Sequence, residues 1–130
     1  MPKRDQPVPE ESLPERTAKQ ASRMPEDANA HLRHGWALYG AGDPQGAAAE
    51  ARRAAEVAPG DPESPYLLGV ALKAAGDAGG AVAAFRSAAS LAAQQGDASR
   101  AAMLRRLAVG QANWLEKGDW DLEPETWVRT

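Results

Sequence analysis

Two histidines, His31 and His34, are the residues whose type and spacing most directly suggest chemistry. Side chains three residues apart share one face of a helix, and imidazole is a common metal ligand and a proton carrier near neutral pH. A metal site needs further ligands, but the chain contains no cysteine and no third ligand stands near the pair. We therefore expect both histidines to pack or to form hydrogen bonds, and we expect no metal site.

Three other kinds of segment could carry chemistry, and each has a simpler explanation. The glycines of GAGDPQG, residues 40–46, have the wrong spacing for a nucleotide-binding loop and follow no strand, which indicates a turn between helices. The arginine pairs at 52–53 and 105–106 lie among acids, as solvated helix surfaces do. The carboxylates of residues 119–125 lack the ligand order of a calcium loop. No nucleophile is paired with a base, so we expect no enzymatic activity, no catalytic residue and no cofactor.

The composition limits the class of protein. With 130 residues, 43% of them hydrophobic and 25% charged, the chain has the size and residue mix of one globular domain. Its net charge of −3 argues against a nucleic-acid or membrane partner, because phosphate groups attract basic surfaces. No apolar run approaches the roughly 18 residues that suggest a membrane span. The absence of cysteine fits a reducing compartment, and we expect a cytoplasmic protein.

The sequence divides into three parts. Residues 1–26 hold five of the ten prolines and no aromatic residue, which predicts a disordered arm rich in proline and charge. Residues 27–117 are rich in alanine, the residue with the highest helix propensity. Residues 118–130 form an acidic tail that contains two of the four tryptophans. We therefore expect one helical domain between two flanking segments.

The helical part contains an internal repeat of 34 residues. Residues 27–60 and 61–94 align without gaps at fourteen identical positions, and seven of these identities are not alanine. Aspartates that can cap helix starts and glycines that can end helices recur between apolar stretches of helical period. This pattern predicts helices at 28–41, 44–58, 62–75, 78–94 and 98–117.

The repeat resembles the tetratricopeptide repeat (TPR) family in its length and in its helix, turn, helix pattern. The family's W-x2-L-G-x2-Y spacing is occupied in the first unit by His31, His34, Gly35 and Leu38. In the second unit it is occupied by Pro65, Leu68, Gly69 and Leu72, followed by Ala81 and Phe85. The resemblance implies an all-α fold, a short right-handed α-solenoid of two TPR-like helical hairpins.

The predicted helix at 98–117 has the pattern of a C-terminal capping helix, since a third full repeat is absent. Leu104, Leu107 and Trp114 project onto one helix face together with several alanines. Asn113 and the charged residues near it project onto the opposite face. A polar outer face is what keeps the end of a solenoid soluble, so we expect the apolar face to pack on the repeats.

In TPR arrays the first helix of each unit lines a concave surface, and the resemblance places eight residues of this chain there. They are Asn29, Leu32, Trp36, Tyr39, Glu63, Tyr66, Val70 and Lys73. Large aromatic side chains are frequent anchors of protein interfaces. We therefore expect a non-catalytic TPR-type adaptor or scaffold that binds an apolar or amphipathic segment of a protein or peptide partner.

Two alternatives to the adaptor stay open. The first is a TPR-type assembly or secretion chaperone that shields an apolar segment of one client protein. A client that binds tightly and is insoluble alone would favour the chaperone, and several weak partners would favour the adaptor. The second, more remote alternative is an enzyme, which a loss of turnover on changing His31 or His34 would support.

The acidic tail carries large apolar residues, namely Trp120, Leu122 and Trp127, that are unusual in a solvated segment. We expect it to fold back on the last helices, because a missing half-repeat leaves apolar surface at the end of a solenoid. The alternative is a linear motif that docks on another protein. Removal of the tail should lower stability in the first case and abolish partner binding in the second.

Overall fold

The computed structural model of this protein describes residues 11–96 and 99–120. Within these ranges the chain forms six α-helices and no strand. The helices are α1 (Leu13–Arg23), α2 (Ala28–Gly40), α3 (Pro44–Val57), α4 (Glu63–Ala74), α5 (Ala78–Gln94) and α6 (Ser99–Lys117). The five helices predicted from the repeat are confirmed, each to within one residue at either end.

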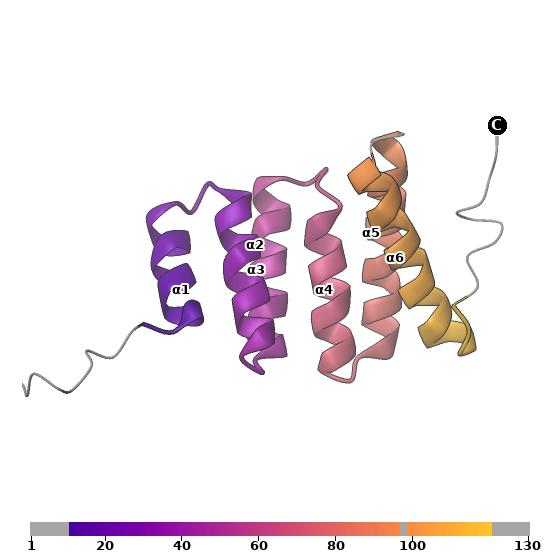
Figure 1. Ribbon diagram of the computed structural model, residues 1–130, viewed down its shortest axis with the longest axis horizontal. Coiled ribbons are helices and arrows are strands. Elements are labelled where there is room, and N and C mark those ends of the chain that lie inside the picture. Colours follow the sequence, from indigo (N-terminus) through magenta and orange to yellow (C-terminus); the bar gives the residue numbers. More distant parts are fainter. Residues whose placement is uncertain (1–10, 97–98, 121–130) are drawn as a thin grey trace, which may run out of the picture.

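The helices follow one another in chain order from one end of the molecule to the other, and each packs on the next one (Figure 1). Two antiparallel pairs, α2 with α3 and α4 with α5, are the predicted TPR-like hairpins. The first helices of successive units also touch, α2 against α4 and α4 against α6. This arrangement confirms the all-α, TPR-like helical-repeat fold, and it places α2, α4 and α6 on one side of the row.

Aspartate side chains cap the starts of three of the repeat helices, and the caps by Asp43 and Asp77 are predicted from the sequence. The carboxylates of Asp43 and Asp77 accept hydrogen bonds of 2.9 Å from the N–H groups of Gly46 and Gly80. Asp27 accepts from the N–H of Asn29 at the start of α2. These contacts satisfy N–H groups that have no partner within the helix, so the helix starts are determined locally.

The prediction of a disordered arm over residues 1–26 is wrong for α1, and residues 1–10 lie outside the described part of the chain. Ser12 caps α1 by accepting from the N–H of Glu15, and Pro14 stands in the first turn, where no donor is lost. Thr17 and Ala21 are buried as α1 packs on α2. The helix is therefore stabilised by tertiary contact, which composition alone does not report.

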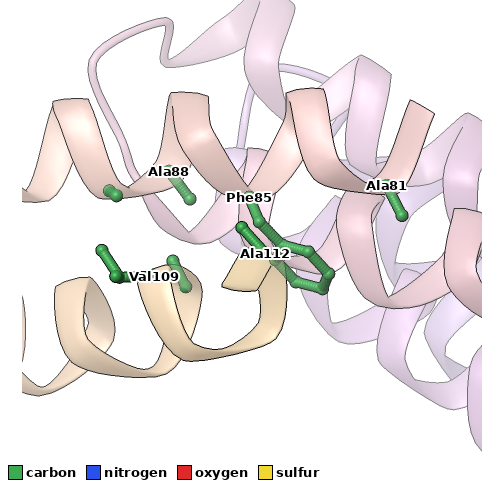
Figure 2. Close-up of a cluster of buried hydrophobic side chains, with 7 residues drawn as sticks. Ala81, Phe85, Ala88, Val109 and Ala112 are labelled. Atoms are coloured by element: carbon green, nitrogen blue, oxygen red, sulfur yellow. The ribbon is translucent and has the colours of Figure 1, made fainter. Parts of the chain in front are cut away.

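Close helix approach in the core depends on alanine and glycine. Phe85 of α5 and Leu67 of α4 are the largest apolar side chains that are completely buried, and most of their buried apolar neighbours are alanines (Figure 2). A Cβ atom added at Gly69 would lie 2.7 Å from the ring of Phe85, and one at Gly35 would lie 2.6 Å from Leu67. The spacing that the two units share therefore places a glycine of α2 and of α4 beneath a large side chain of a following helix.

Gly69→Ala should lower the free energy of unfolding by about 1–3 kcal/mol, the usual effect of inserting atoms into a packed core. The matched control is Gly79→Ala in α5, because no atom lies within 4 Å of an added Cβ there. That change should be neutral or stabilise by up to about 1 kcal/mol through helix propensity. Urea denaturation followed by circular dichroism measures both, and equal effects would contradict the close contact of Gly69 with Phe85.

The orientation of α6 differs from the prediction. Its alanines do face α5, but Asn113 is completely buried and its amide oxygen accepts from Arg86 at 2.9 Å. Trp114 and Leu107 are instead 52% and 39% exposed. The helix approaches α5 through its small residues, which turns these larger apolar side chains toward solvent, so its outer face is not purely polar.

Candidate functional site

The face formed by α2, α4 and α6 contains an open apolar cavity of about 200 Å³. Trp36 and Tyr66 line one side of it, and α6 supplies the other side with Met103, Leu104 and Leu107. The Trp36 ring lies edge-on to Tyr39 with centroids 6.0 Å apart and tilted against Tyr66 at 6.4 Å. Such ring contacts hold the tryptophan in one orientation, so this wall of the cavity is preorganised.

Charged groups stand at the rim of the same cavity. Arg100 of α6 donates to the carboxylate of Glu63 on α4 at 2.7 Å, and both residues line the cavity. The Arg100 side chain is largely exposed. Because ion pairs in solvent contribute little, about 0–1 kcal/mol, this pair can rearrange when another group approaches.

The structure brings three of the eight predicted surface residues together in this cavity, namely Trp36, Glu63 and Tyr66. Asn29 lines a neighbouring cavity of about 300 Å³ that also contains Glu63. Tyr39 lies exposed beside Trp36. These residues therefore follow the face of α2 and α4 that the repeat register indicates.

The other predicted surface residues lie elsewhere. The prediction is wrong for Leu32, which is only 3% exposed and packs in the core against Ala54 and Leu67. Val70 is half-buried against the cluster around Phe85. Lys73 is exposed and donates to the side chain of Gln111 at 3.0 Å. Leu32 is buried because the following helices close over its side of α2.

The contribution of α6 to this cavity was missed in the sequence. The sequence pattern predicts no role for Met103 or Arg100, and it predicts that Leu107 packs on the repeats. The available signal was the order of the helices, since α6 follows α5 as α4 follows α3. A first helix of a third unit must lie on the same side of the row as α2 and α4.

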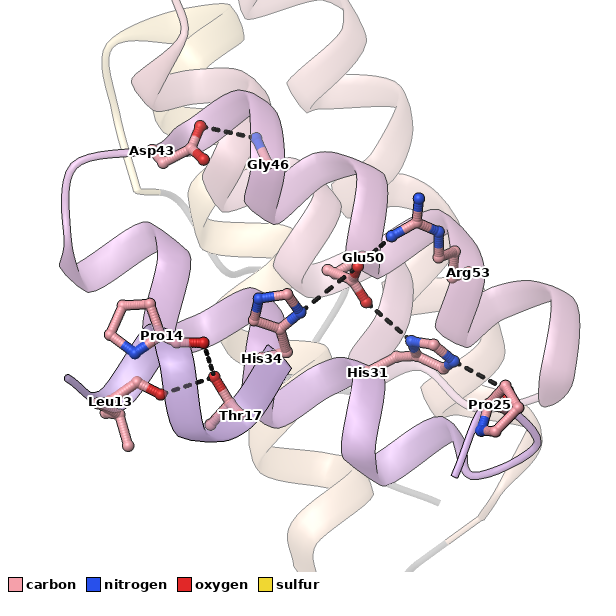
Figure 3. Close-up of polar contacts among 10 residues, drawn as sticks. All are labelled: Leu13, Pro14, Thr17, Pro25, His31, His34, Asp43, Gly46, Glu50 and Arg53. Carbon is pink, nitrogen blue, oxygen red and sulfur yellow. Dashed lines mark hydrogen bonds and ion pairs between the residues drawn. The ribbon is translucent and has the colours of Figure 1, made fainter. Parts of the chain in front are cut away.

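A second, polar cluster lies between α2 and α3, centred on the buried carboxylate of Glu50 (Figure 3). His31 Nδ1 lies 2.8 Å from Glu50 Oε2, and His34 Nδ1 lies 3.5 Å from Glu50 Oε1. Arg53 also donates to this carboxylate from the next turn of α3. The expectation that the histidines form hydrogen bonds is confirmed for His31, and Glu50 is the partner that the sequence did not reveal.

The protonation of His31 follows from its two contacts. Its Nδ1 faces the Glu50 carboxylate, and its Nε2 lies 2.9 Å from the carbonyl oxygen of Pro25, in the segment between α1 and α2. Burial lowers the pKa of His31, but the hydrogen bonds to Glu50 and Pro25 outweigh it and raise the pKa above its ordinary value. An imidazolium donates from both nitrogens, so the charged form satisfies both acceptors.

This cluster joins three parts of the fold. Within residues 11–96 and 99–120, no three histidines, cysteines or acids are arranged to hold a metal ion. His31 and Glu50 are both buried, and their contacts join α2, α3 and the segment that follows α1. The cluster therefore links the first hairpin to the helix before it.

Of the three predicted tail contacts, only Trp120 lies in the described part of the chain. Its indole covers Gly110 of α6, where an added Cβ atom would come within 2.0 Å of the ring. Leu122 and Trp127 lie outside the described residues.

In residues 11–96 and 99–120, none of the helices is both long and apolar enough to cross a membrane.

Comparison with known proteins identifies the fold. No protein-family model matches this sequence, and the curated protein sequences include no significant match. Among solved structures, the chain is similar to the crystal structure of PcrH in complex with the chaperone binding region of PopD. The similarity has a TM-score of 0.73, covers 78% of this chain and 74% of that chain, and accompanies 20% sequence identity. The two chains thus share a helical-repeat fold.

Proposed function

We propose that this protein is a non-catalytic interaction module, an adaptor that binds an apolar or amphipathic segment of a protein partner on the α2, α4, α6 face. The observation that carries the proposal is the apolar cavity between Trp36, Tyr66 and the Met103 to Leu107 turn of α6. Three helices from three successive units contribute to it. A surface built in this way suits a segment that runs across the row.

The size of the cavity indicates what it receives. Sites for small molecules usually enclose about 300–1,000 Å³, whereas this one holds about 200 Å³ and is open to solvent. A single large side chain of a peptide fits such a volume. The remaining apolar contact comes from Met103, which is 63% exposed. The segment would therefore be anchored by one apolar residue and guided by the charges of Glu63 and Arg100.

A peptide is also favoured over a nucleic acid by charge. The net charge of the sequence is −3, and the basic group at the cavity rim, Arg100, stands beside the carboxylate of Glu63. A phosphate backbone requires a continuous basic surface to bind. An amphipathic helix in a groove, or an extended peptide, requires only apolar anchors and a polar rim.

Trp36→Ala should weaken peptide binding by about 2 kcal/mol or more, as truncation of an aromatic anchor does. The probe is a peptide of about 20 residues, the lower end of what each side of a standard interface contributes, selected from a display library on the wild-type protein. Titration calorimetry measures its affinity. The matched control is Trp114→Ala, because Trp114 is exposed on α6 and does not line the cavity.

Trp36 packs against the core, so its removal can also affect folding, and a second variant that leaves the core intact is needed. Met103→Asp places a charge at the cavity without disturbing a buried group, and it should also weaken binding. The adaptor proposal fails if both folded variants keep full affinity, or if no library peptide binds the wild type.

A chaperone for one client is the second candidate. The solved structure of similar fold, PcrH, was crystallised with the chaperone binding region of PopD, and this observation favours a corresponding role here. The two candidates predict different partners. A chaperone would form a stoichiometric complex with a client that aggregates without it, whereas an adaptor would bind several partners that are soluble alone.

A further inference from the structure

Helix α6 carries apolar side chains on two sides. Its alanines pack on α5, while Met103, Leu107 and Trp114 are exposed. These three residues are spaced by four and seven positions, so they form one strip along the helix. We call them the α6 strip. In a helical-repeat array, a helix that is apolar on two sides has a neighbour on each.

Trp120 already packs against part of the α6 strip. The indole lies on Gly110, which stands between Leu107 and Trp114 along the strip. Phe85 of α5 lies on Gly69 of α4 in the same manner. Trp120 therefore covers a glycine of α6 as Phe85, from the helix that follows α4, covers a glycine of α4.

The chain reverses direction to make this contact. Gly118 has a φ angle of +70°, a conformation that glycine adopts without strain, and it ends α6. Trp120 then lines a cavity of about 400 Å³ together with residues of the first half of α6, among them Met103, Arg106 and Leu107. Residues 119 and 120 have thus turned back along the helix that precedes them.

We propose that residues 121–130 continue along the α6 strip and that Trp127 enters the cavity beside Met103 and Leu107. The segment starts at Trp120, which is already seated on the strip. It contains Trp127 and further apolar residues that match the strip. The α6 strip would therefore be covered by a segment of the same chain.

The lengths agree with this placement. Met103 lies seven residues before Gly110, which is about 10 Å along a helix. Seven residues also separate Trp120 from Trp127, and extended chain of that length spans up to about 25 Å. The segment can therefore reach the cavity with slack for a bend. Ten extended residues cover up to about 36 Å, more than the roughly 28 Å of a 19-residue helix.

A spin label at residue 130 tests the proposal without any partner protein. The chain has no cysteine, so Thr130→Cys provides a unique labelling position in the segment under test. Its three methionines give three methyl signals after isotope labelling, and they report on different places. Met103 lies in the α6 strip, whereas Met24 caps the C-terminal end of α1, the helix at the opposite end of the molecule.

The expected result is a large loss of the Met103 signal in the oxidised label, with the Met24 signal retained. Adding Trp127→Ala to the labelled chain should restore Met103, and the control Arg129→Ala should not. An unaffected Met103 signal overturns the proposal, as does a loss that Trp127→Ala leaves unchanged. Mixing spin-labelled chains with isotope-labelled chains that carry no label should leave Met103 intact, and a loss there would assign the α6 strip to a second copy instead.

The test is independent of peptide binding on the α2, α4, α6 face. If the tail docks but no peptide binds, the adaptor proposal alone fails. If a peptide binds while Met103 is unaffected by the label, the tail proposal alone fails. Met103 and Leu107 line both cavities, so the variants for the two tests are kept separate.

Discussion

Phe85→Ala is expected to lower the free energy of unfolding by about 3–5 kcal/mol, which is the range for removing a buried aromatic ring. Phe85 is the only phenylalanine of the chain and is completely buried where α4, α5 and α6 meet. Its buried neighbours are mostly alanines, whose short side chains cannot fill the space (Figure 2). A large cavity therefore remains.

Urea denaturation monitored by circular dichroism measures this loss. Domains of this size unfold with about 5–15 kcal/mol in total, so Phe85→Leu serves as a milder variant that remains folded. The matched control is Leu107→Ala, since Leu107 is partly exposed and its removal should have a much smaller effect. Equal losses for Phe85→Ala and Leu107→Ala would show that the core does not depend on the ring.

Glu50→Ala is expected to have the second largest effect, about 3 kcal/mol, because removal of one partner from a buried ionic contact leaves the other uncompensated. His31 would keep its contact with Pro25 but lose the acceptor for its other nitrogen. Arg53 would lose the same carboxylate at the edge of the cluster. The first hairpin and its contact with the preceding segment would both be weakened.

Glu56→Ala is the matched control, because Glu56 lies exposed on the same helix. Surface substitutions of this kind usually change stability by less than about 0.5 kcal/mol. Thermal and urea unfolding at one pH compare the two variants. Similar stabilities for Glu50→Ala and Glu56→Ala would contradict a structural role for the Glu50 cluster.

The same cluster predicts how stability changes with pH. The pKa of His31 is raised in the folded protein, so the protonated form is favoured by folding. Its contribution is complete below the pKa of an unfolded histidine, about 6.5. It is lost as the pH rises through the higher pKa of the folded state. Melting temperatures should therefore fall from pH 6 toward pH 8.5, and His31→Gln should reduce this fall.

How much of the fold could be predicted depends on how local its causes are. The aspartate caps and the glycine turns act within a few residues, so five helices were placed correctly from the sequence. The first helix was missed because its segment is polar and contains prolines. One signal was present nevertheless: Thr17 and Pro25 stand 34 residues before Ala51 and Pro59. The repeat pattern thus extends into α1.

The candidate site was predicted only in part. Trp36, Glu63 and Tyr66 lie together as the repeat register indicates. Leu32 and Asn113 show the limit, because one was expected on the surface and is buried, and the other was expected to face away from the repeats and is buried too. Glu50 was unremarkable in the sequence, yet its carboxylate holds the polar cluster of the first hairpin. Whether each of these side chains is buried depends on which neighbouring helices pack over it.

The sequence by itself determined the repeat, the helix boundaries and the positions where small residues let helices approach, because capping, turn formation and side-chain volume are properties of short segments. Only the tertiary structure decided which side of each helix is covered. The exposure of Met103 and Leu107, and the burial of Asn113, follow from which side of α6 packs on α5, namely the side of its alanines. That side is decided by the fit of two helix surfaces, and no single helix contains this information.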